Sequence, residues 1–440
     1  MEVRDVAKAV YRVEPEAACA DDDSPSGYKR TEVGVIPEDW KLTSLQMVGT
    51  FSKGQGIRKD ESSSGSIPCV RYGEIYTHHN DILRKFNSHI SERVAQSSTP
   101  LKSGDILFAG SGETKEEIGK AVAYVGQERA YAGGDIVILT PHGFASTFLG
   151  YSLNAPSIVR QKAARGQGDA VVHITSGSLS SVVVPIPPTL AEQQAIAETL
   201  SDADALIESL QQLIAKQRAL KQGAMQALLT SRRRLPGFTG EWQTKRLGKI
   251  AVFCKGKGLP KSALDDGGRF PCVHYGELFT RLPESIRETC SRTNWAGDTF
   301  RSLINDVLMP TSDVTPSGLA KASCVVMDGV IIGGDVLVIR TDPRIICGTF
   351  LSYVIRNSES QILQLVTGTT VFHLYASDMR KFEFRVPPIA EQEAIIAVLS
   401  DMDAEIEALE ARLSKTRALK AGMMQQLLTG RIRLPLERTA

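Results

Sequence analysis

The sequence predicts a mixed α/β fold in which two tandem α+β domains are separated by two long helices packed as an antiparallel coiled coil. Three observations predict it. The two halves of the 440-residue chain repeat one another, each half ends in a long helical segment, and both segments carry acidic residues first and basic residues last. A chain of this length is expected to form two to four domains of roughly 100–200 residues.

The repeat is visible in several blocks that recur about 200 residues later, in the same order. "KGQG" from Lys53 matches "KGKG" from Lys255, and "PCVRYGEIYT" matches "PCVHYGELFT". "GGDIVIL" likewise matches "GGDVLVI". Short β-rich runs at 136–140, 182–186, 336–339 and 382–386 lie between Gly and Pro residues, which is typical of strands joined by tight turns. Each half is therefore a mixed α/β block followed by a helix.

The two helical segments begin after a Pro-Pro pair, as "PPTLAEQ" from Pro187 and "PPIAEQ" from Pro387. Their apolar positions alternate spacings of three and four, a 3.5-residue period that predicts a coiled-coil seam rather than a helix lying on a globular core. In the first helix the seam is Ile196, Leu200, Ala203, Ile207, Leu210, Ile214, Gln217, Lys221, Ala224 and Leu228, and in the second it is Ile395, Leu399, Met402, Ile406, Leu409, Leu413, Thr416, Lys420, Met423 and Leu427. The polar seam residues fix the register or face a partner protein.

The charge gradient along each helix suits its own macrodipole, and it also favours antiparallel packing, which places acidic residues beside basic ones. About 40 residues at 1.5 Å per residue give helices of about 60 Å. We expect a rod with one α/β block at each end.

These features divide the chain into six segments. They are a flexible N-terminal extension (1–27), a first α/β domain (28–188), a central helix (189–231), a second α/β domain (232–388), a C-terminal helix (389–431) and a tail (432–440).

Composition excludes several classes of protein. The formal charge is +1, so a DNA-binding function would need its positive charge gathered on one face. No apolar run approaches the roughly 20 residues of a membrane span, and we expect a cytoplasmic protein without a membrane partner. The seven cysteines form no C-x-x-C pair and no two His lie at ligand spacing near them, so we expect buried free thiols, no metal site and no cofactor.

The chain resembles the specificity subunits of type I restriction-modification systems. The resemblance covers residues 28–434 and is carried by "YKRTEVGVIPEDW", by the two "PP…AEQ" helix starts, and by the helix ends "ALKQGAMQALLTSRRRLPGF" and "ALKAGMMQQLLTGRIRLP". It implies two target-recognition domains that read a split sequence in double-stranded DNA, with the helices as a spacer. It further implies assembly with two modification (methyltransferase) subunits and with restriction (endonuclease/translocase) subunits.

The residues themselves favour a chain that is not an enzyme. It has no GxxxxGK[ST] phosphate loop, and neither Pro-Pro pair has the flanks of an adenine methyltransferase motif. Asp105, Glu113 and Lys115 have the rough spacing of a nuclease site, but Val314 and Pro316 stand where the second half would need the last two. The alternative function, from another class, is a structural coiled-coil adaptor that binds only proteins.

Candidate DNA-binding residues lie in four Gly-rich segments of each half, where Arg, Lys, Gln, Glu, Ser and Thr could reach base edges or phosphates. They are Lys53, Gln55, Arg58, Lys59, Arg71, Tyr72, Glu74, Ser111, Thr114, Lys115, Arg165 and Gln167 in the first half, and Lys255, Lys257, Lys261, His274, Tyr275, Glu277, Ser312, Thr315, Thr369 and Thr370 in the second. These segments differ between the halves, which predicts two different half-sites and therefore an asymmetric target.

Several of these positions have a structural alternative. Tyr72 and Tyr275 could equally pack in a core, and a structural role is favoured for His173 and His373. The run 232–234, three arginines after the first helix, could be a solvated helix end, a phosphate contact or a methyltransferase contact. The glycines of "KGQG" and "KGKG" are favoured as turn residues.

Overall fold

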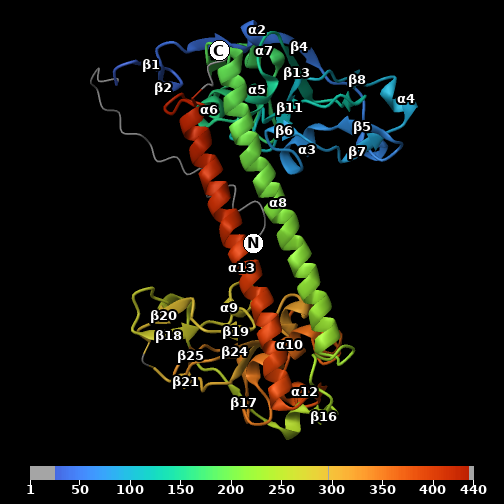
Figure 1. Ribbon diagram of the computed structural model, residues 1–440, viewed down its shortest axis with the longest axis vertical. Helices are drawn as coiled ribbons and strands as arrows, with labels where there is room; N and C mark the ends of the chain where they lie inside the picture. The colour runs from blue at the N-terminus through green and yellow to red at the C-terminus, as the bar shows by residue number, and fades with distance from the viewer. Residues whose placement is uncertain (1–24, 296, 436–440) are drawn as a thin grey trace. The chain divides into compact units, whose positions relative to one another are not determined.

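The computed structural model describes residues 25–295 and 297–435 (Figure 1). The chain forms two compact units: the first unit contains residues 25–210 and 412–435, and the second contains residues 211–411. Both long helices contribute to both units, α8 with its N-terminal half in the first and α13 with its N-terminal half in the second. Most of the expected N-terminal extension, residues 1–24, and residues 436–440 of the expected tail lie outside the described residues.

The first unit is built on a five-stranded sheet of order β4-β13-β9-β11-β6 and a four-stranded sheet of order β7-β5-β12-β8. The strands of the larger sheet are β4 (Gly49–Lys53), β13 (Ile136–Pro141), β9 (Ile106–Ala109), β11 (Ala121–Tyr124) and β6 (Ile82–Leu83). Those of the smaller sheet are β7 (Ser88–Ile90), β5 (Ile67–Val70), β12 (Tyr131–Ala132) and β8 (Thr99–Pro100). Three strand pairs complete the unit: β1 (Tyr28–Thr31) with β2 (Gly34–Pro37), β3 (Lys41–Ser44) with β15 (Val183–Ile186), and β10 (Ser111–Gly112) with β14 (Val172–His173).

The second unit repeats this topology, with sheets of order β17-β26-β22-β24-β19 and β20-β18-β25-β21. The strands of the larger sheet are β17 (Ala251–Lys255), β26 (Val336–Thr341), β22 (Val307–Pro310), β24 (Ser323–Val325) and β19 (Ser285–Ile286). Those of the smaller sheet are β20 (Ser291–Thr293), β18 (Phe270–Val273), β25 (Ile331–Ile332) and β21 (Phe300–Arg301). The pairs β16 (Gln243–Arg246) with β28 (Glu383–Val386) and β23 (Ser312–Asp313) with β27 (Phe372–His373) match β3–β15 and β10–β14. The internal repeat seen in the sequence is thus a repeat of strand order.

Helices connect and cover these sheets. In the first unit they are α2 (Leu45–Val48), η1 (Lys59–Glu61), α3 (Tyr72–Thr77), α4 (Glu92–Ala95), α5 (Ser146–Ser152), α6 (Pro156–Arg165) and α7 (Ser176–Ser180). In the second unit they are η2 (Leu247–Lys249), η3 (Lys261–Ala263), α9 (Glu277–Thr280), η4 (Pro316–Ala320), α10 (Gly348–Asn357), α11 (Glu359–Leu363) and α12 (Ala376–Met379). The two long helices are α8 (Leu190–Leu228) and α13 (Ile389–Leu427), and they confirm the expectation of two long helical segments.

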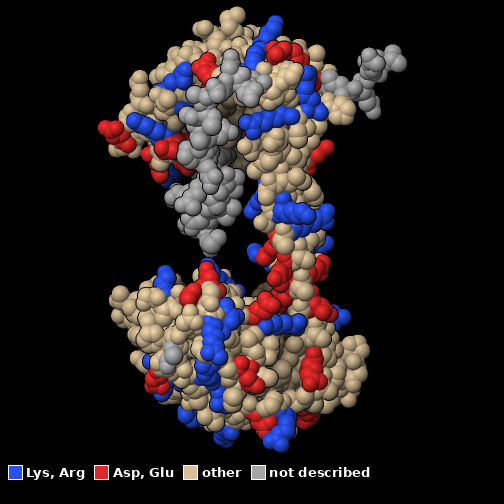
Figure 2. All heavy atoms as spheres, turned by 90° about the vertical axis from the view of Figure 1, so that its left-hand side faces the viewer, with Lys and Arg blue, Asp and Glu red and all other residues tan. Residues whose placement is uncertain are grey.

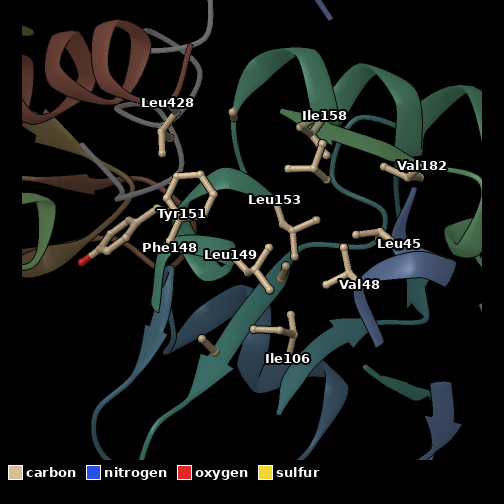
Figure 3. Close-up of a cluster of buried hydrophobic side chains, with 14 of the residues drawn as sticks. Leu45, Val48, Ile106, Phe148, Leu149, Tyr151, Leu153, Ile158, Val182 and Leu428 are labelled. Carbon is tan, nitrogen blue, oxygen red and sulfur yellow. The ribbon is translucent and has the colours of Figure 1, made fainter. Parts of the chain in front are cut away.

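The core of the first unit includes the ends of both long helices. Phe148 and Tyr151 of α5 lie close to Leu428, which follows α13, as Figure 3 shows. Ile196 and Leu200 of α8 belong to the same buried cluster. The core of the second unit likewise contains residues from both helices, among them Leu228, Leu229, Ile395 and Leu399. Each α/β block is therefore attached by apolar packing to the start of one helix and the end of the other.

Within each unit the helices run antiparallel, as the charge gradient predicts. In the second unit Arg218 of α8 pairs with Glu410 of α13 at 2.6 Å, and Lys221 pairs with Asp403. In the first unit Asp204 pairs with Lys420 at 2.7 Å. Each predicted seam residue is buried or half-buried, which confirms the coiled-coil seam.

The shared "AEQ" at the two helix starts has a structural explanation. The carboxylate of Glu391, which is fully buried, accepts hydrogen bonds from Arg234 at 2.5 and 2.6 Å and from the Trp242 indole at 3.1 Å. Glu192 accepts from Arg433 at 2.8 and 2.7 Å. The glutamines that follow bind the backbone, since Gln193 Oε1 accepts from the Ala145 amide and Gln392 Oε1 from the Cys347 amide. Each helix start is thus held by the arginine that follows the other long helix.

Arg234 therefore has a role that none of the three alternatives for residues 232–234 included, while Arg232 and Arg233 are exposed. Arg433 lies in the expected tail, where it also pairs with Asp39 at 2.9 Å.

Replacing Glu391 with Gln should lower the free energy of unfolding by about 2 kcal/mol, because the Arg234 guanidinium loses its bidentate partner. Chemical denaturation of the full chain measures this. Glu393→Gln, at an exposed carboxylate two residues further along the same helix, is the matched control and should change stability little. Equal stabilities for the two variants would contradict the role of the buried pair.

The thiols only partly follow expectation. Cys69, Cys272 and Cys324 are buried and free, but Cys290 is exposed, and Cys19 lies outside the described residues. No helix in the described part of the chain is long and apolar enough to cross a membrane.

Candidate nucleic-acid interface

The glycines of "KGQG" and "KGKG" let two loops approach each other. A Cβ on Gly54 would stand 2.1 Å from the carbonyl oxygen of Gly133, and one on Gly256 would stand 2.0 Å from that of Gly333. No side chain fits there. Gly54 and Gly256 therefore allow a close backbone approach directly after β4 and β17, and they bring the exposed Lys53 and Lys255 beside the loops that precede β13 and β26.

Glu74 and Glu277, both predicted to contact DNA, are buried carboxylates, Glu74 in the capping box of α3 and Glu277 at the first residue of α9. Glu74 Oε2 accepts a hydrogen bond from the Arg71 amide at 2.9 Å, and its other oxygen accepts from Ser88. Glu277 accepts from the His274 amide at 2.7 Å and from Ser291 at 2.8 Å. Their side-chain oxygens are engaged inside the fold, so the shared "YGE" is explained by local structure. Burial and these internal partners count against a base contact by either carboxylate.

A Ser–His ribbon brings two distant loops together in each unit. In the first, β10 and β14 place Ser111 opposite His173, and the Ser111 hydroxyl lies 2.9 Å from His173 Nδ1. The His173 amide also donates to the Gln167 carbonyl at 2.7 Å, and the His173 carbonyl accepts from the Gln167 amide at 2.9 Å. The His173 side chain is exposed. The ring is thereby held on a rigid ribbon with its Nε2 edge directed away from the serine bond.

This ribbon borders a groove of about 550 Å³. Three of the four predicted segments line it: Lys53 from "KGQG", Ser111 from "GSGETK" and His173 from "ARGQGDAVVH", together with Asp135. The fourth is linked to the groove by Tyr76, whose hydroxyl donates to the Ser111 carbonyl at 3.1 Å. The structure therefore gathers residues that are far apart in sequence around one concave surface.

The equivalent ribbon of the second unit carries different side chains. β23 and β27 place Ser312 opposite His373, and the His373 ring stacks on Tyr375 with centroids 5.9 Å apart. Tyr375 is 53% exposed and stands where the first unit has Thr175. The two units thus present the same backbone with different chemical groups. Tyr375 was not among the predicted residues, because the sequence shows only that a tyrosine stands where the first half has Thr175.

The remaining predicted residues divide by exposure. Those exposed are Lys53, Gln55, Arg58, Lys59, Tyr72, Thr114, Lys115, Gln167, Lys255, Lys257, Lys261, Tyr275, Thr315, Thr369 and Thr370. Those half-buried are Arg71, Arg165, His274 and Ser312, and Ser111 is buried. Exposed Tyr72 and Tyr275 are not core residues, so that structural alternative is wrong for both.

Some of these residues are already engaged within the fold. The Arg165 guanidinium donates to Ser181 Oγ at 2.9 Å and to the Gln161 carbonyl at 2.9 Å, which ties it to its own helix and the next. Lys257 pairs with Asp298 at 2.9 Å. The suspected nuclease residue Asp105 is also a structural group, since its carboxylate accepts from the Lys102 amide at 2.8 Å and from Thr140 at 2.6 Å.

Buried lysines anchor the far end of the "GSGETK" loop. Lys162 Nζ donates to the Gly119 carbonyl at 2.6 Å, and Lys120 Nζ donates to the His79 carbonyl at 2.6 Å. Burial, aided by the nearby Lys120 ammonium, lowers the pKa of Lys162 from 10.5 to about 7. The loop beside the groove is therefore held by a lysine whose pKa is close to neutral pH.

This lowered pKa predicts a pH dependence of stability. Between about pH 7 and 10.5 the unfolded state holds the Lys162 proton and the folded state has lost it, so the free energy of unfolding should rise with pH across this window. In Lys162→Met that contribution is absent. We expect the stability of the wild type relative to Lys162→Met to increase between about pH 7 and pH 9.5 in denaturant titrations. Lys115→Met, at an exposed lysine of the same loop, should show no such trend; a flat difference for Lys162→Met would contradict the assignment.

Figure 2 shows how charge is distributed on one face. Lys and Arg side chains form a band over the second unit, while Asp and Glu side chains lie scattered around them. A chain of net charge +1 can therefore still present local positive surface.

Two copies of one α+β fold, each with its own set of loop side chains and each packed on both long helices, define a duplicated recognition subunit. A sequence model described as the type I restriction modification DNA specificity domain matches residues 37–216 and again residues 239–416. The chain belongs to the family of type I restriction-modification specificity subunits.

Relatives along nearly the whole chain agree with this assignment. A putative type I restriction enzyme MjaX specificity subunit from Methanocaldococcus jannaschii is 24% identical over 92% of this chain and 97% of its own. The StySPI specificity subunit from Salmonella potsdam is 21% identical over 90% of this chain and 89% of its own.

Solved structures share the fold. The type I restriction-modification S subunit from M. genitalium superposes with a TM-score of 0.59 at 15% identity, covering 88% of this chain and 96% of that one. A structure from work on complex assembly and conformational transition of the type I system gives a TM-score of 0.53 at 18% identity, covering 90% of this chain and 99% of that one. The expected arrangement of two recognition domains with a long helix pair is confirmed.

Proposed function

We propose that this chain is a non-catalytic subunit that reads a bipartite, asymmetric sequence in double-stranded DNA, each unit reading one half-site. The observation that carries this proposal is the repeated Ser–His ribbon with its different neighbours, Thr175 in one unit and Tyr375 in the other. A common backbone gives both units the same docking geometry, and different side chains give each its own sequence preference.

The residues proposed for DNA contact are those that remain accessible. Lys53 and Lys115 in the first unit and Lys255 and Lys261 in the second are exposed cations suited to phosphates. Gln167 and His173, and in the second unit Thr369, Thr370 and Tyr375, are exposed groups beside the ribbons and suited to base edges. Glu74, Glu277 and Arg165 are left out because internal hydrogen bonds occupy them.

The proposal includes protein partners: two modification (methyltransferase) subunits, and through them restriction subunits. One face of α8 supports a helical partner, because Leu206, Leu213 and Leu220 are 40%, 38% and 51% exposed at intervals of seven residues. A stripe with this period is suited to packing against another helix. Catalysis would reside in those partners, and the domain boundaries 28–188 and 232–388 are proposed as the units of recognition.

The test is binding of the complex with its modification subunit to duplex DNA as a function of salt. Phosphate contacts impose a linear fall of log affinity with log salt concentration, and removing one of them should reduce that slope by about 1. Lys53→Ala is expected to do so on any sequence, whereas Lys41→Ala, at an exposed lysine of β3, should not. His173→Ala is expected to weaken discrimination in the first half-site alone, by about 1–3 kcal/mol.

The competing function is a coiled-coil adaptor that binds only proteins. It predicts a complex that forms normally but shows no salt-dependent DNA binding, and that result would refute the recognition proposal.

A further inference from the structure

A buried lysine stands where each α/β block meets the helix pair. In the first unit Lys420 of α13 pairs with Asp204 of α8 at 2.7 Å and with Asp81 at 2.8 Å. In the second unit Lys221 of α8 pairs with Asp403 of α13 and with Glu284 at 3.1 Å. Each lysine side chain is 13% exposed. One ammonium group therefore joins both helices and one α/β block, and the arrangement occurs twice.

Aromatic residues complete both clusters in the same way. The Tyr151 ring lies 5.1 Å from Lys420 Nζ, and its hydroxyl donates to Asp204 at 2.8 Å. The Tyr353 ring lies 5.4 Å from Lys221 Nζ, and its hydroxyl donates to Asp403 at 2.6 Å. Burial opposes the charged form of Lys420, but Asp81 and Asp204 outweigh it and raise its pKa above 10.5. The ammonium therefore stays charged and keeps both carboxylates as partners.

The carboxylates on the block side are fixed to the sheet. Asp81 immediately precedes the edge strand β6, and its carbonyl accepts from the Ala123 amide at 3.0 Å. Glu284 precedes the edge strand β19, and its carbonyl accepts from the Cys324 amide at 2.9 Å. A shift of the sheet against the helices would therefore break the contact with the lysine.

The lysine contact is a second point of attachment. Apolar packing joins each block to the helix pair near Leu200 and Leu399. Asp204 and Asp403 lie four residues further along their helices, about 6 Å. Apolar packing and the Gln193 and Gln392 hydrogen bonds hold each block at a helix start. The lysine and tyrosine contacts lie further along the helix and are directional, so they oppose rocking of the block about that start.

We propose that Lys420 and Lys221 are positioning residues that fix the angle of each recognition domain on the helix pair and thereby set how strictly the length of the DNA spacer is enforced. This rests on the proposed function. Adding one base pair moves a half-site by about 3.4 Å and turns it by about one tenth of a helical turn. A domain free to rock would follow such a displacement, and a clamped one would not.

Asp81→Asn and Glu284→Gln test the proposal, because each keeps its shape and leaves the lysine paired with the helix carboxylate. The amide carries no charge, so even with its oxygen toward the ammonium it loses the charge-assisted part of the attraction. The full complex is assayed for methylation of duplexes with the native spacer and with one base pair more or less. We expect the preference for the native spacer to fall about tenfold or more in each variant, with the half-site bases unchanged.

Asp202→Asn and Asp401→Asn, at exposed carboxylates of the same helices, are the matched controls and should keep the native preference. An equal loss of methylation on all spacers, or an unchanged preference in both Asp81→Asn and Glu284→Gln, would overturn the positioning role. Lys420→Met, with its assembly checked by thermal unfolding of the complex, should relax the spacer further than Asp81→Asn. A wild-type complex that methylates no split target would instead refute the proposed function.

Discussion

Replacing residues 28–188 with a second copy of residues 235–388 should convert the target into a palindrome made from the second half-site. Both recognition domains would then be identical, and because each is packed on antiparallel helices, we expect them to read the same bases on opposite strands. Methylation of the original asymmetric target should fall about 1,000-fold or more, because each mismatched base pair costs about 1–3 kcal/mol. Methylation sequencing of DNA treated with the chimeric complex measures both outcomes.

The structure indicates that this chimera will fold, because each interface between block and helices recurs. The copied Glu284 would meet Lys420 as Asp81 does, and the copied Tyr353 would meet Asp204. The copied Cys347 amide would face Gln193, whose side-chain oxygen accepts a hydrogen bond from the Ala145 amide in the native chain. The reciprocal chimera, with 28–188 copied over 235–388, should give a palindrome of the first half-site. An unchanged asymmetric motif in either chimera would contradict the proposal that each domain reads its own half-site.

Inserting four residues into both helices, after Leu210 in α8 and after Ala411 in α13, should lengthen the spacer by one or two base pairs. Four residues add about 6 Å and about 40° of rotation, against about 3.4 Å and 35° per base pair. Methylation of the original spacing should fall about 100-fold, as expected for a displacement of several ångströms. Motif sequencing of the mutant complex reads the new spacer directly.

Both helices must change together, because the ion pairs of each unit lie on either side of these positions. An insertion in α8 alone would put Asp204 and Lys221 out of register with their partners on α13, and it should lower stability instead of changing the spacer. It therefore serves as the control. A doubly inserted complex that still acts on the original spacing alone would show that the helices do not set the distance.

The sequence predicts the repeat, the two helices, their seam and their antiparallel direction, because each follows from a local periodicity or from the order of charges along the helix. The strands at 136–140 and 336–339 were recognisable for the same reason: β-rich runs end at turn residues. A pattern of this kind can be recognised without knowing what the segment packs against.

Long-range partners could not be predicted. The sequence predicts that Lys420 fixes the seam register or faces a partner subunit. It does pair with Asp204 of α8 across the seam, but its second partner, Asp81, lies 339 residues away in sequence. Arg433 was assigned to a tail and instead holds the start of α8 through Glu192. Nothing in the local sequence identifies Asp81 or Glu192 as the partner of these side chains.

The sequence predicts which segments come together better than which of their residues are accessible. The Gly-rich loops do meet around one groove, because glycines permit the close approach of backbones there. Some polar residues within these loops, such as Gln167, are accessible, and others, such as Glu74, are buried caps. Only their burial in the fold separates the two groups. The sequence favours a structural role for His173, and its ring does contact the Ser111 hydroxyl while the residue also lines the groove.

We propose that one chain reads two different half-sites at a fixed separation. Sequencing of the methylated positions in DNA exposed to the wild-type complex with its modification subunit tests this. We expect one motif with two unlike specific halves around a non-specific spacer of constant length. A contiguous motif, a palindrome, or methylation without sequence preference would contradict it.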